Sequence, residues 1–158
     1  MNRVGFGFDV HPLVPGRPLV LGGVTIESDL GLSGHSDADV LSHAIGEALL
    51  GALALGDLGR HFPDGDDRYR GISSLVLLRQ VTELLAAQDA RIVNVDATVL
   101  AEKPRLSTRL PEMAKRLADV LGLAVGRVSV KAKSPEGLGL IGRREGIAAM
   151  AVVSVEVP

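Results

Sequence analysis

The stretch from Gly34 to Asp57 constrains the fold of this chain more than any other. It opens with a polar cluster and continues into apolar residues at spacings of one, three and four, the pattern of one face of a helix. Asp39, His43 and Glu47 follow one another at intervals of four and form a polar stripe on that helix. A stripe that only faced water would more commonly carry Lys and Glu. The histidine between two acids therefore indicates a functional role.

The ends of this helix are predicted from capping chemistry. Ser36 or Asp37 is expected to be its N-cap, and its end is expected near residues 55–56. Free N–H groups at the start of a helix favour anions. His35, which stands beside this start, is therefore a candidate hydrogen-bond donor to a phosphate oxygen.

Shorter patterns on both sides of the helix predict the strands of a sheet. Gly5 and Gly7 inside the first strand indicate close approach of another backbone or a ligand. Ser73 or Ser74 is expected to cap a second helix over 75–87. Ser107 or Thr108 is expected to cap a third, which Gly122 ends. Strands are expected over residues 3–10, 19–26 (a candidate hairpin partner of the first), 92–100, 128–132 and 147–157.

This order of elements predicts an α/β (α+β) fold. The whole chain, residues 1–158, is expected to form a single domain in a ferredoxin-like arrangement. Its mixed sheet would have about four to five strands, with helices on one face. The last strand has few polar outward positions, so the outer face of the sheet is expected to be covered by another subunit.

Charge and composition exclude several classes of function. A net charge of −2 without basic runs argues against a nucleic-acid or membrane surface. The absence of Cys excludes disulfides and thiolate metal sites. Neither a signal-type segment nor an apolar run of about 18 residues is present, so a cytoplasmic protein is expected.

Asp9, His11 and His43 offer a ligand set for a metal. Asp9 and His11 lie two apart at the end of a strand, so their side chains point the same way. One carboxylate and two imidazoles suit Zn²⁺ and leave a fourth position open, as in catalytic zinc sites. Asp39 and Glu47 are candidates for orienting His43. Taken singly, His11 fits a loop role equally well, and His43 fits a buried, hydrogen-bonded histidine.

Two loops carry further candidate residues. Asp57, Asp64 and Asp66 lie in a Gly-rich segment where carboxylates suit polyol hydroxyls, although Asp and Gly also simply make turns. After a later strand, Ser134 suits a phosphate and Glu136 a hard divalent cation.

Four motifs together resemble the 2-C-methyl-D-erythritol 2,4-cyclodiphosphate synthase family. They are FDVH at 8–11, GHSDADVLSH at 34–43, ALLGALALGDLG at 48–59 with HFPD at 61–64, and GRREGIA at 142–148. The resemblance implies conversion of 4-diphosphocytidyl-2-C-methyl-D-erythritol 2-phosphate to the 2,4-cyclodiphosphate and CMP. It also implies a homotrimer with active sites between subunits.

The resemblance also implies residue roles. Asp9, His11 and His43 match zinc ligands, Glu136 matches the residue of a second cation, Mg²⁺ or Mn²⁺, and His35 and Ser134 match residues that stabilise the transition state. Expected substrate contacts are Ser36, Asp57, Gly59, Phe62, Asp64 and Asp66 for the erythritol part, Ala101, Pro104, Arg105, Leu106, Ser107, Ala132 and Lys133 for the cytidine, and Arg143. Phe8, Arg143 and Glu145 match a central cavity that holds isoprenoid diphosphates in some members.

The sequence departs from the family pattern at a few positions. Glu47 stands where some members have Asp, Leu140 replaces a common aromatic residue, and Arg144 replaces Gly beside the central cavity. None of these is a zinc ligand.

The rival functions are a metal-dependent phosphohydrolase that uses the same residues, and a non-catalytic metal- or nucleotide-binding trimer.

Overall fold

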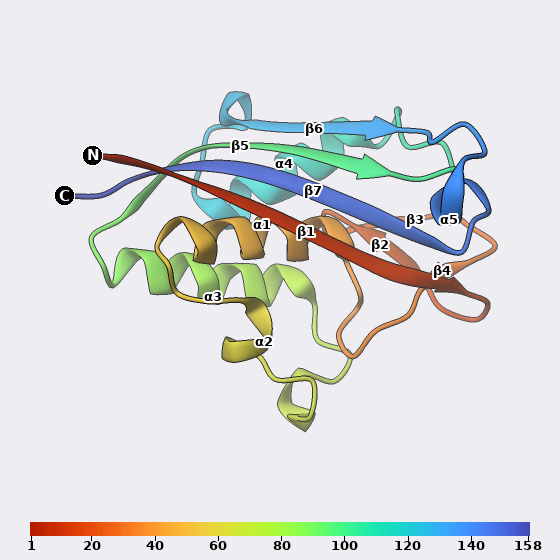
Figure 1. Cartoon of the computed structure of the whole chain (residues 1–158), viewed down its shortest axis with the longest axis horizontal. Coiled ribbons are helices and arrows are strands. Elements are labelled where there is room, and N and C mark those ends of the chain that lie inside the picture. The colour runs from red at the N-terminus through yellow and green to blue at the C-terminus, as the bar shows by residue number, and fades with distance from the viewer.

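The long strands of this chain pair into one mixed sheet in the computed structural model, which describes residues 1–158 (Figure 1). The strands are β1 (Asn2–Val14), β4 (Gly31–Leu32), β5 (Arg91–Leu100), β6 (Val128–Lys133) and β7 (Gly146–Glu156). Their order across the sheet is β4-β1-β7-β5-β6. Only β5 and β6 run parallel, and α4 connects them (Leu110–Leu121). The predicted mixed sheet is confirmed.

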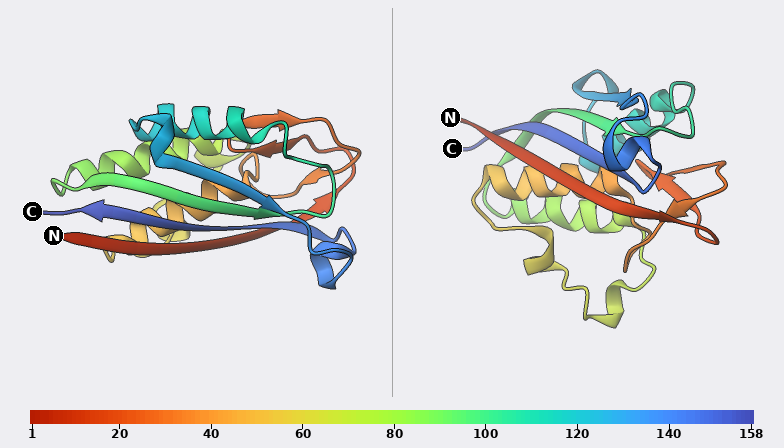
Figure 2. Two further views of the ribbon diagram at one scale, coloured as in Figure 1. Left: turned by 90° about the horizontal axis from the view of Figure 1, so that it is seen from above. Right: turned by 45° about the vertical axis from the view of Figure 1, so that its right-hand side comes forward.

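The long helices cover one face of this sheet (Figure 2). They are α1 (Val40–Ala52), α3 (Ser74–Ala86) and α4. Their apolar faces join the inward side chains of β5 and β7 in one core. The short elements are α2 (Leu58–His61), η1 (Asp67–Tyr69), η2 (Val125–Arg127) and α5 (Gly139–Gly142).

None of these helices combines the length and the apolar character needed to cross a membrane.

Two glycines let α1 lie directly on the backbone of β1. A Cβ at Gly5 would collide with the carbonyl oxygen of Ala48, and one at Gly7 with that of Ala44. The predicted close approach is thus confirmed, and the approaching backbone is α1. Because Asp9 and His11 follow Gly7 on β1, while His43 precedes Ala44 on α1, this packing also sets the distance between the candidate ligands.

The predicted strand over 19–26 and its pairing with the first strand are wrong. The segment folds back on itself as β2 (Leu19–Leu21) and β3 (Val24–Ile26), a separate two-stranded sheet. Gly22 and Gly23 turn the chain with φ of 57° and 73°. Positive φ at both central residues defines the tight hairpin turn that suits the twist of paired strands.

Helix boundaries differ from the predictions at several ends. The N-cap of α1 is Asp39, not Ser36 or Asp37, and the helix ends at Ala52, before the predicted 55–56. No side chain caps α4, so the predicted caps at its start, Ser107 and Thr108, are wrong. Ser73 does cap α3, and Gly122 ends α4 in the left-handed conformation, as predicted.

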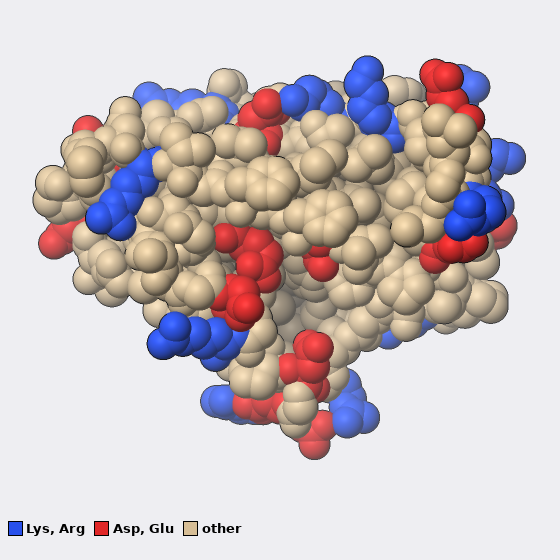
Figure 3. All heavy atoms as spheres, in the orientation of Figure 1, with Lys and Arg blue, Asp and Glu red and all other residues tan.

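The other face of the sheet carries exposed apolar side chains. Alternation along β1 buries Gly5 and Gly7 against α1 and leaves the intervening residues outward. Phe6 is 62% exposed, and Val4, Phe8, Val10 and, on β7, Val152 accompany it. We call this set the outer sheet face. Figure 3 shows a broad region without charged side chains over the β1 and β7 strands.

Candidate metal centre and substrate pocket

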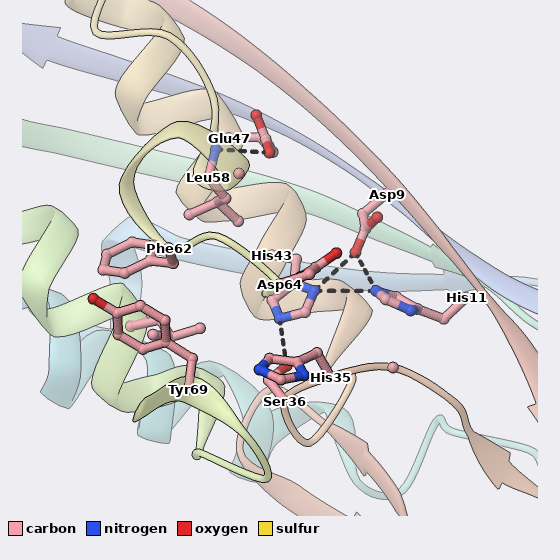
Figure 4. Close-up of a pocket in the computed structure, with 13 residues that line it drawn as sticks. Asp9, His11, His35, Ser36, His43, Glu47, Leu58, Phe62, Asp64 and Tyr69 are labelled. Atoms are coloured by element: carbon pink, nitrogen blue, oxygen red, sulfur yellow. Dashed lines mark hydrogen bonds and ion pairs between the residues drawn. The ribbon is translucent and has the colours of Figure 1, made fainter. Parts of the chain in front are cut away.

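Asp9, His11 and His43 converge at the junction of β1 and α1 (Figure 4). Asp9 Oδ2 lies 2.9 Å from His11 Nε2 and 2.9 Å from His43 Nδ1. The two imidazole nitrogens lie 3.2 Å apart. The structure therefore brings together the three residues that the sequence predicted as metal ligands.

The backbone determines which nitrogen of His11 is free. His11 Nδ1 lies 2.9 Å from the carbonyl oxygen of Ser33, and a carbonyl can only accept a hydrogen bond. The proton of the neutral ring is therefore on Nδ1, and Nε2 presents a lone pair toward Asp9 and His43. Burial lowers the pKa of His11, but its hydrogen bond with Asp9 and the Asp9 charge outweigh burial and raise the pKa above 6.5.

The electrostatics of the cluster favour a cation. Burial raises the pKa of Asp9, but its interactions with His11 and His43, which are strongest when those rings are protonated, outweigh burial and lower the pKa to about 2. Asp9 is thus an anion facing two imidazoles. Tetrahedral zinc with ligand bonds near 2.0–2.1 Å would separate its ligand atoms by about 3.3 Å. The observed separations of 2.9, 2.9 and 3.2 Å lie close to that value, so the donor set fits such an ion.

The carboxylates of Asp39 and Glu47 make no hydrogen bond to the His43 ring, contrary to the prediction. Asp39 is fully buried and accepts from the N–H groups of Gly22 at 2.9 Å and Gly23 at 2.8 Å, and from the hydroxyl of Ser42 at 2.7 Å. Burial raises the pKa of Asp39, and these donors oppose the rise. Asp39 therefore fastens the β2–β3 turn to α1.

Glu47 lines a cavity in front of Asp9, His11 and His43 instead. It accepts from the N–H of Leu58 at 3.1 Å, and burial raises its pKa.

A cavity of about 420 Å³ opens in front of the three ligands. Acidic side chains surround a hollow below β1 and β7 on the surface in Figure 3. Tyr69, Leu77 and Leu58, which the sequence did not single out, supply apolar wall. The predicted residues that line the cavity are Asp9, His11, His35, Ser36, His43, Gly59, Phe62 and Asp64.

Asp57 and Asp66 shape the cavity without lining it. Asp57 caps α2 by accepting from the N–H of Arg60 at 2.9 Å. The carbonyl of Asp66 lies 3.0 Å from His35 Nε2, so this nitrogen carries a proton and donates. His35 is thereby tied to η1, with Nδ1 left for another partner.

A second groove of about 550 Å³ holds the predicted cytidine residues. Ser134 donates to Glu102 Oε2 at 3.1 Å, and the same oxygen accepts from the N–H of Gly137 at 3.2 Å. Glu102 falls within the range 101–107 that the resemblance assigns to the cytidine, although no role was predicted for it singly. The predicted residues that line the groove are Ala101, Pro104, Arg105, Leu106, Ser107, Ala132, Lys133 and Ser134.

The remaining predicted residues lie outside both hollows within one chain. Glu136 is exposed, and its N–H donates to Ser134 Oγ at 3.0 Å. Arg143 pairs with Glu145 at 2.7 Å. Phe8 lies on the outer sheet face, 52% exposed. Arg144, at a φ of 59°, pairs with Asp29 at 2.7 Å.

Comparison with known proteins relates the whole chain to one family. Residues 2–156 match the YgbB family. The 2-C-methyl-D-erythritol 2,4-cyclodiphosphate synthase of Pelotomaculum thermopropionicum is 58% identical over 97% of this chain and 94% of its own length. The enzyme of the same name from Nitrosospira multiformis is 59% identical over 95% of this chain and 85% of its own.

Solved structures give the same relation. A 2C-methyl-D-erythritol-2,4-cyclodiphosphate synthase in its CDP-bound form shares 36% identity at a TM-score of 0.90, covering 98% of this chain and 100% of that chain. The bifunctional IspDF from Campylobacter jejuni shares 39% identity at a TM-score of 0.96. It covers all of this chain, which spans 43% of that longer protein.

Proposed function

This chain belongs to the YgbB family, and we propose that it is a 2-C-methyl-D-erythritol 2,4-cyclodiphosphate synthase, a lyase of isoprenoid precursor synthesis. The observation that most supports this proposal is the cluster of Asp9, His11 and His43 at the mouth of a polar cavity. Its substrate would be 4-diphosphocytidyl-2-C-methyl-D-erythritol 2-phosphate, whose 2-phosphate attacks the β-phosphorus and displaces CMP.

The chain's own groups supply positioning and charge in this reaction, because no protein nucleophile is needed. Asp9, His11 and His43 would hold a Zn²⁺ ion, which when bound supplies positive charge and Lewis acidity to the diphosphate. His35, held at Nε2 by the Asp66 carbonyl, is in place to donate from Nδ1 to a phosphate oxygen in its imidazolium form. The Asp64 carboxylate and the Gly59 N–H suit the erythritol hydroxyls.

The two hollows support an active site shared between subunits. The metal cluster and the second groove are separate within one chain. The outer sheet face is apolar and exposed, as an interface with a second copy requires. We infer a homotrimer in which the second groove of one subunit, with Ser134, binds cytidine beside the metal cluster of the next. Phe8 would then face the trimer axis, and Arg143 and Glu145 would line a central cavity for an isoprenoid diphosphate.

Glu136 would hold the second cation. Its carboxylate is exposed, and no other side chain of the chain bonds it. A carboxylate with open space suits Mg²⁺ or Mn²⁺, both of which prefer oxygen ligands. Glu136→Gln would then weaken the Mg²⁺ dependence of turnover without removing zinc.

Phosphorus NMR of the product tests the proposed function directly. The purified chain with Zn²⁺ and Mg²⁺ is incubated with the diphosphocytidyl substrate. Two coupled resonances of a cyclic diphosphate plus the singlet of CMP are expected. A linear phosphate or diphosphate product would instead establish the rival phosphohydrolase, and unchanged substrate would favour the non-catalytic trimer.

A further inference from the structure

His43 makes contacts at both of its ring nitrogens. Nδ1 faces Asp9 and His11, as described above. On the opposite edge of the ring, Nε2 lies 2.8 Å from the hydroxyl of Ser74 and 3.2 Å from that of Ser36. The shorter of these contacts comes from a residue that neither the motifs nor the cavity lining includes.

Ser74 is the first residue of α3 and is 1% exposed. The two carboxylate oxygens of Asp37, which lies in the loop before α1, each accept a hydrogen bond from Ser74. The Ser74 N–H donates to Asp37 Oδ2 at 3.1 Å, and the Ser74 hydroxyl donates to Asp37 Oδ1 in a short hydrogen bond. The Asp37 N–H in turn donates to the carbonyl of Ile72 at 3.0 Å. The loop and the start of α3 therefore fix each other.

The direction of these hydrogen bonds follows from the donor inventory. An ionised carboxylate only accepts, so the single hydroxyl proton of Ser74 points to Asp37. Ser74 Oγ then has only lone pairs for His43 and must accept from Nε2–H. The neutral ring of His43 is thereby protonated on Nε2, and Nδ1 carries the lone pair that a metal needs.

Asp9 opposes this arrangement when no metal is bound. Its Oδ2 lies 2.9 Å from His43 Nδ1 and would attract a proton onto that nitrogen. A ring protonated on Nδ1 cannot ligate from Nδ1. The Ser74–Asp37 pair favours the other tautomer and holds the plane of the ring, as outer hydrogen bonds do for ligating histidines in general.

We propose that Ser74 and Asp37 are positioning residues of the metal centre, which keep His43 in the Nε2–H tautomer with Nδ1 directed at the metal. The proposal rests on the metal-binding part of the proposed function. It parallels the role of the Ser33 carbonyl for His11, except that a side-chain pair from two distant segments replaces the backbone.

The experiment compares Ser74→Ala with Ser73→Ala in the full-length chain. Ser73 is a matched control, because it loses a hydroxyl one residue away that caps α3 but does not touch His43. Zinc affinity is measured by competition with a chromophoric chelator. Ser74→Ala is expected to bind zinc about 10- to 100-fold more weakly, the usual effect of losing such a partner. Ser73→Ala is expected to bind as the unmodified chain does.

A second readout reports the tautomer itself. In the metal-free chain, long-range ¹H–¹⁵N NMR spectra distinguish the Nε2–H and Nδ1–H forms of His43. The unmodified chain and Ser73→Ala are expected to show Nε2–H, and Ser74→Ala a shift toward Nδ1–H. A protein that had merely lost packing at Ser74 would keep the Nε2–H pattern.

The proposal is overturned if folded Ser74→Ala retains unmodified zinc affinity, or if His43 of the unmodified chain is protonated on Nδ1. Circular dichroism establishes folding. Should Ser74→Ala not fold, Asp37→Asn takes its place, because Asn keeps the shape and exchanges one acceptor oxygen for a donor. Asp37→Asn is then expected to weaken zinc binding and mix the tautomers, and unchanged values overturn the proposal. Neither readout involves turnover, so failure of the cyclisation assay is a separate result.

Discussion

At the scale of single residues, protons and a metal cation compete for the same three ligand atoms of the site. Asp9, His11 and His43 present one oxygen and two nitrogens to a common point. Each imidazole uses its other nitrogen for a hydrogen bond elsewhere, to Ser33 or to Ser74. These hydrogen bonds leave a lone pair on the nitrogen of each ring that faces the metal position.

Removing His43 should abolish metal binding while leaving the fold intact. His43→Ala is expected to bind zinc at least about 100-fold more weakly and to lose turnover, because two ligands remain. Zinc content by mass spectrometry and product formation by phosphorus NMR measure both effects. His61→Ala is the control, since His61 bonds only the Leu55 carbonyl at 2.9 Å. Full activity in metal-depleted His43→Ala would contradict the prediction.

The pKa shifts of the cluster predict opposite pH dependences with and without metal. Without metal, the lowered pKa of Asp9 stabilises the fold above pH 3.8, and this stabilisation is lost as pH falls toward about 2. The raised pKa of His11 stabilises below pH 6.5, and that contribution is lost as pH rises through its folded pKa. The cluster of the metal-free chain is therefore most stabilising between pH 3.8 and 6.5.

Bound zinc should reverse the dependence of fold stability on pH around the pKa of His11. Binding displaces the His11 proton, so below the His11 pKa the zinc affinity should fall by about 10-fold for each pH unit. Thermal unfolding at pH 5 and pH 8, with a chelator and with zinc, checks both statements. Zinc should raise the melting temperature more at pH 8. An equal shift at both values would mean that no proton is released.

At the scale of elements, the contact between β1 and α1 sets the site. Gly7→Ala is expected to destabilise the chain by about 3 kcal/mol, at the upper end of overpacking effects, because the new Cβ meets the backbone oxygen of Ala44 and not a movable side chain. Urea unfolding of the metal-free chain measures the loss. Gly126→Ala is the control, since a Cβ there meets nothing within 4 Å. Equal stability of the two variants would rule out the steric account.

Local patterns explain why much of the site was predictable. The alternation of β1 placed Asp9 and His11 on one side, and helical periodicity placed His43 on the adjoining helix. The β2–β3 hairpin was also predictable, because Gly22 and Gly23 separate two short apolar runs, as in a tight hairpin turn. The prediction of a single strand over 19–26 did not use this signal.

Contacts between distant segments could not be predicted in the same way. Ser74 was recognisable as a candidate cap, but its contact with His43 depends on how α3 packs beside α1, 31 residues away in sequence. The four-residue spacing of Asp39 from His43 suggested a hydrogen bond between their side chains that the fold does not make. As N-cap, Asp39 turns back toward Gly22 and Gly23.

At the scale of the whole molecule, the outer sheet face is the surface through which the proposed trimer would form. Phe6→Glu is expected to yield a monomer by light scattering, with turnover reduced by about 100-fold or more, because a charge cannot be buried unpaired. Zinc affinity should persist, since all three ligands come from one chain. Val125→Glu, which charges another exposed apolar side chain, on η2 and away from the outer sheet face, is the control. A fully active monomer would refute the shared site.

The two ends of the chain meet on the sheet, away from β4 and α5 (Figure 1). The Met1 amino group donates to the carbonyl of Val157 at 2.8 Å, and Asn2 pairs with Glu156 across antiparallel strands. A short linker between the ends would turn β7 and β1 into one hairpin. New ends could then be opened at Gly16, where a turn with a φ of 79° has open space around it. Such a permuted chain would keep the pairing of β1 with β7, and with it the positions of Asp9 and His11 on β1.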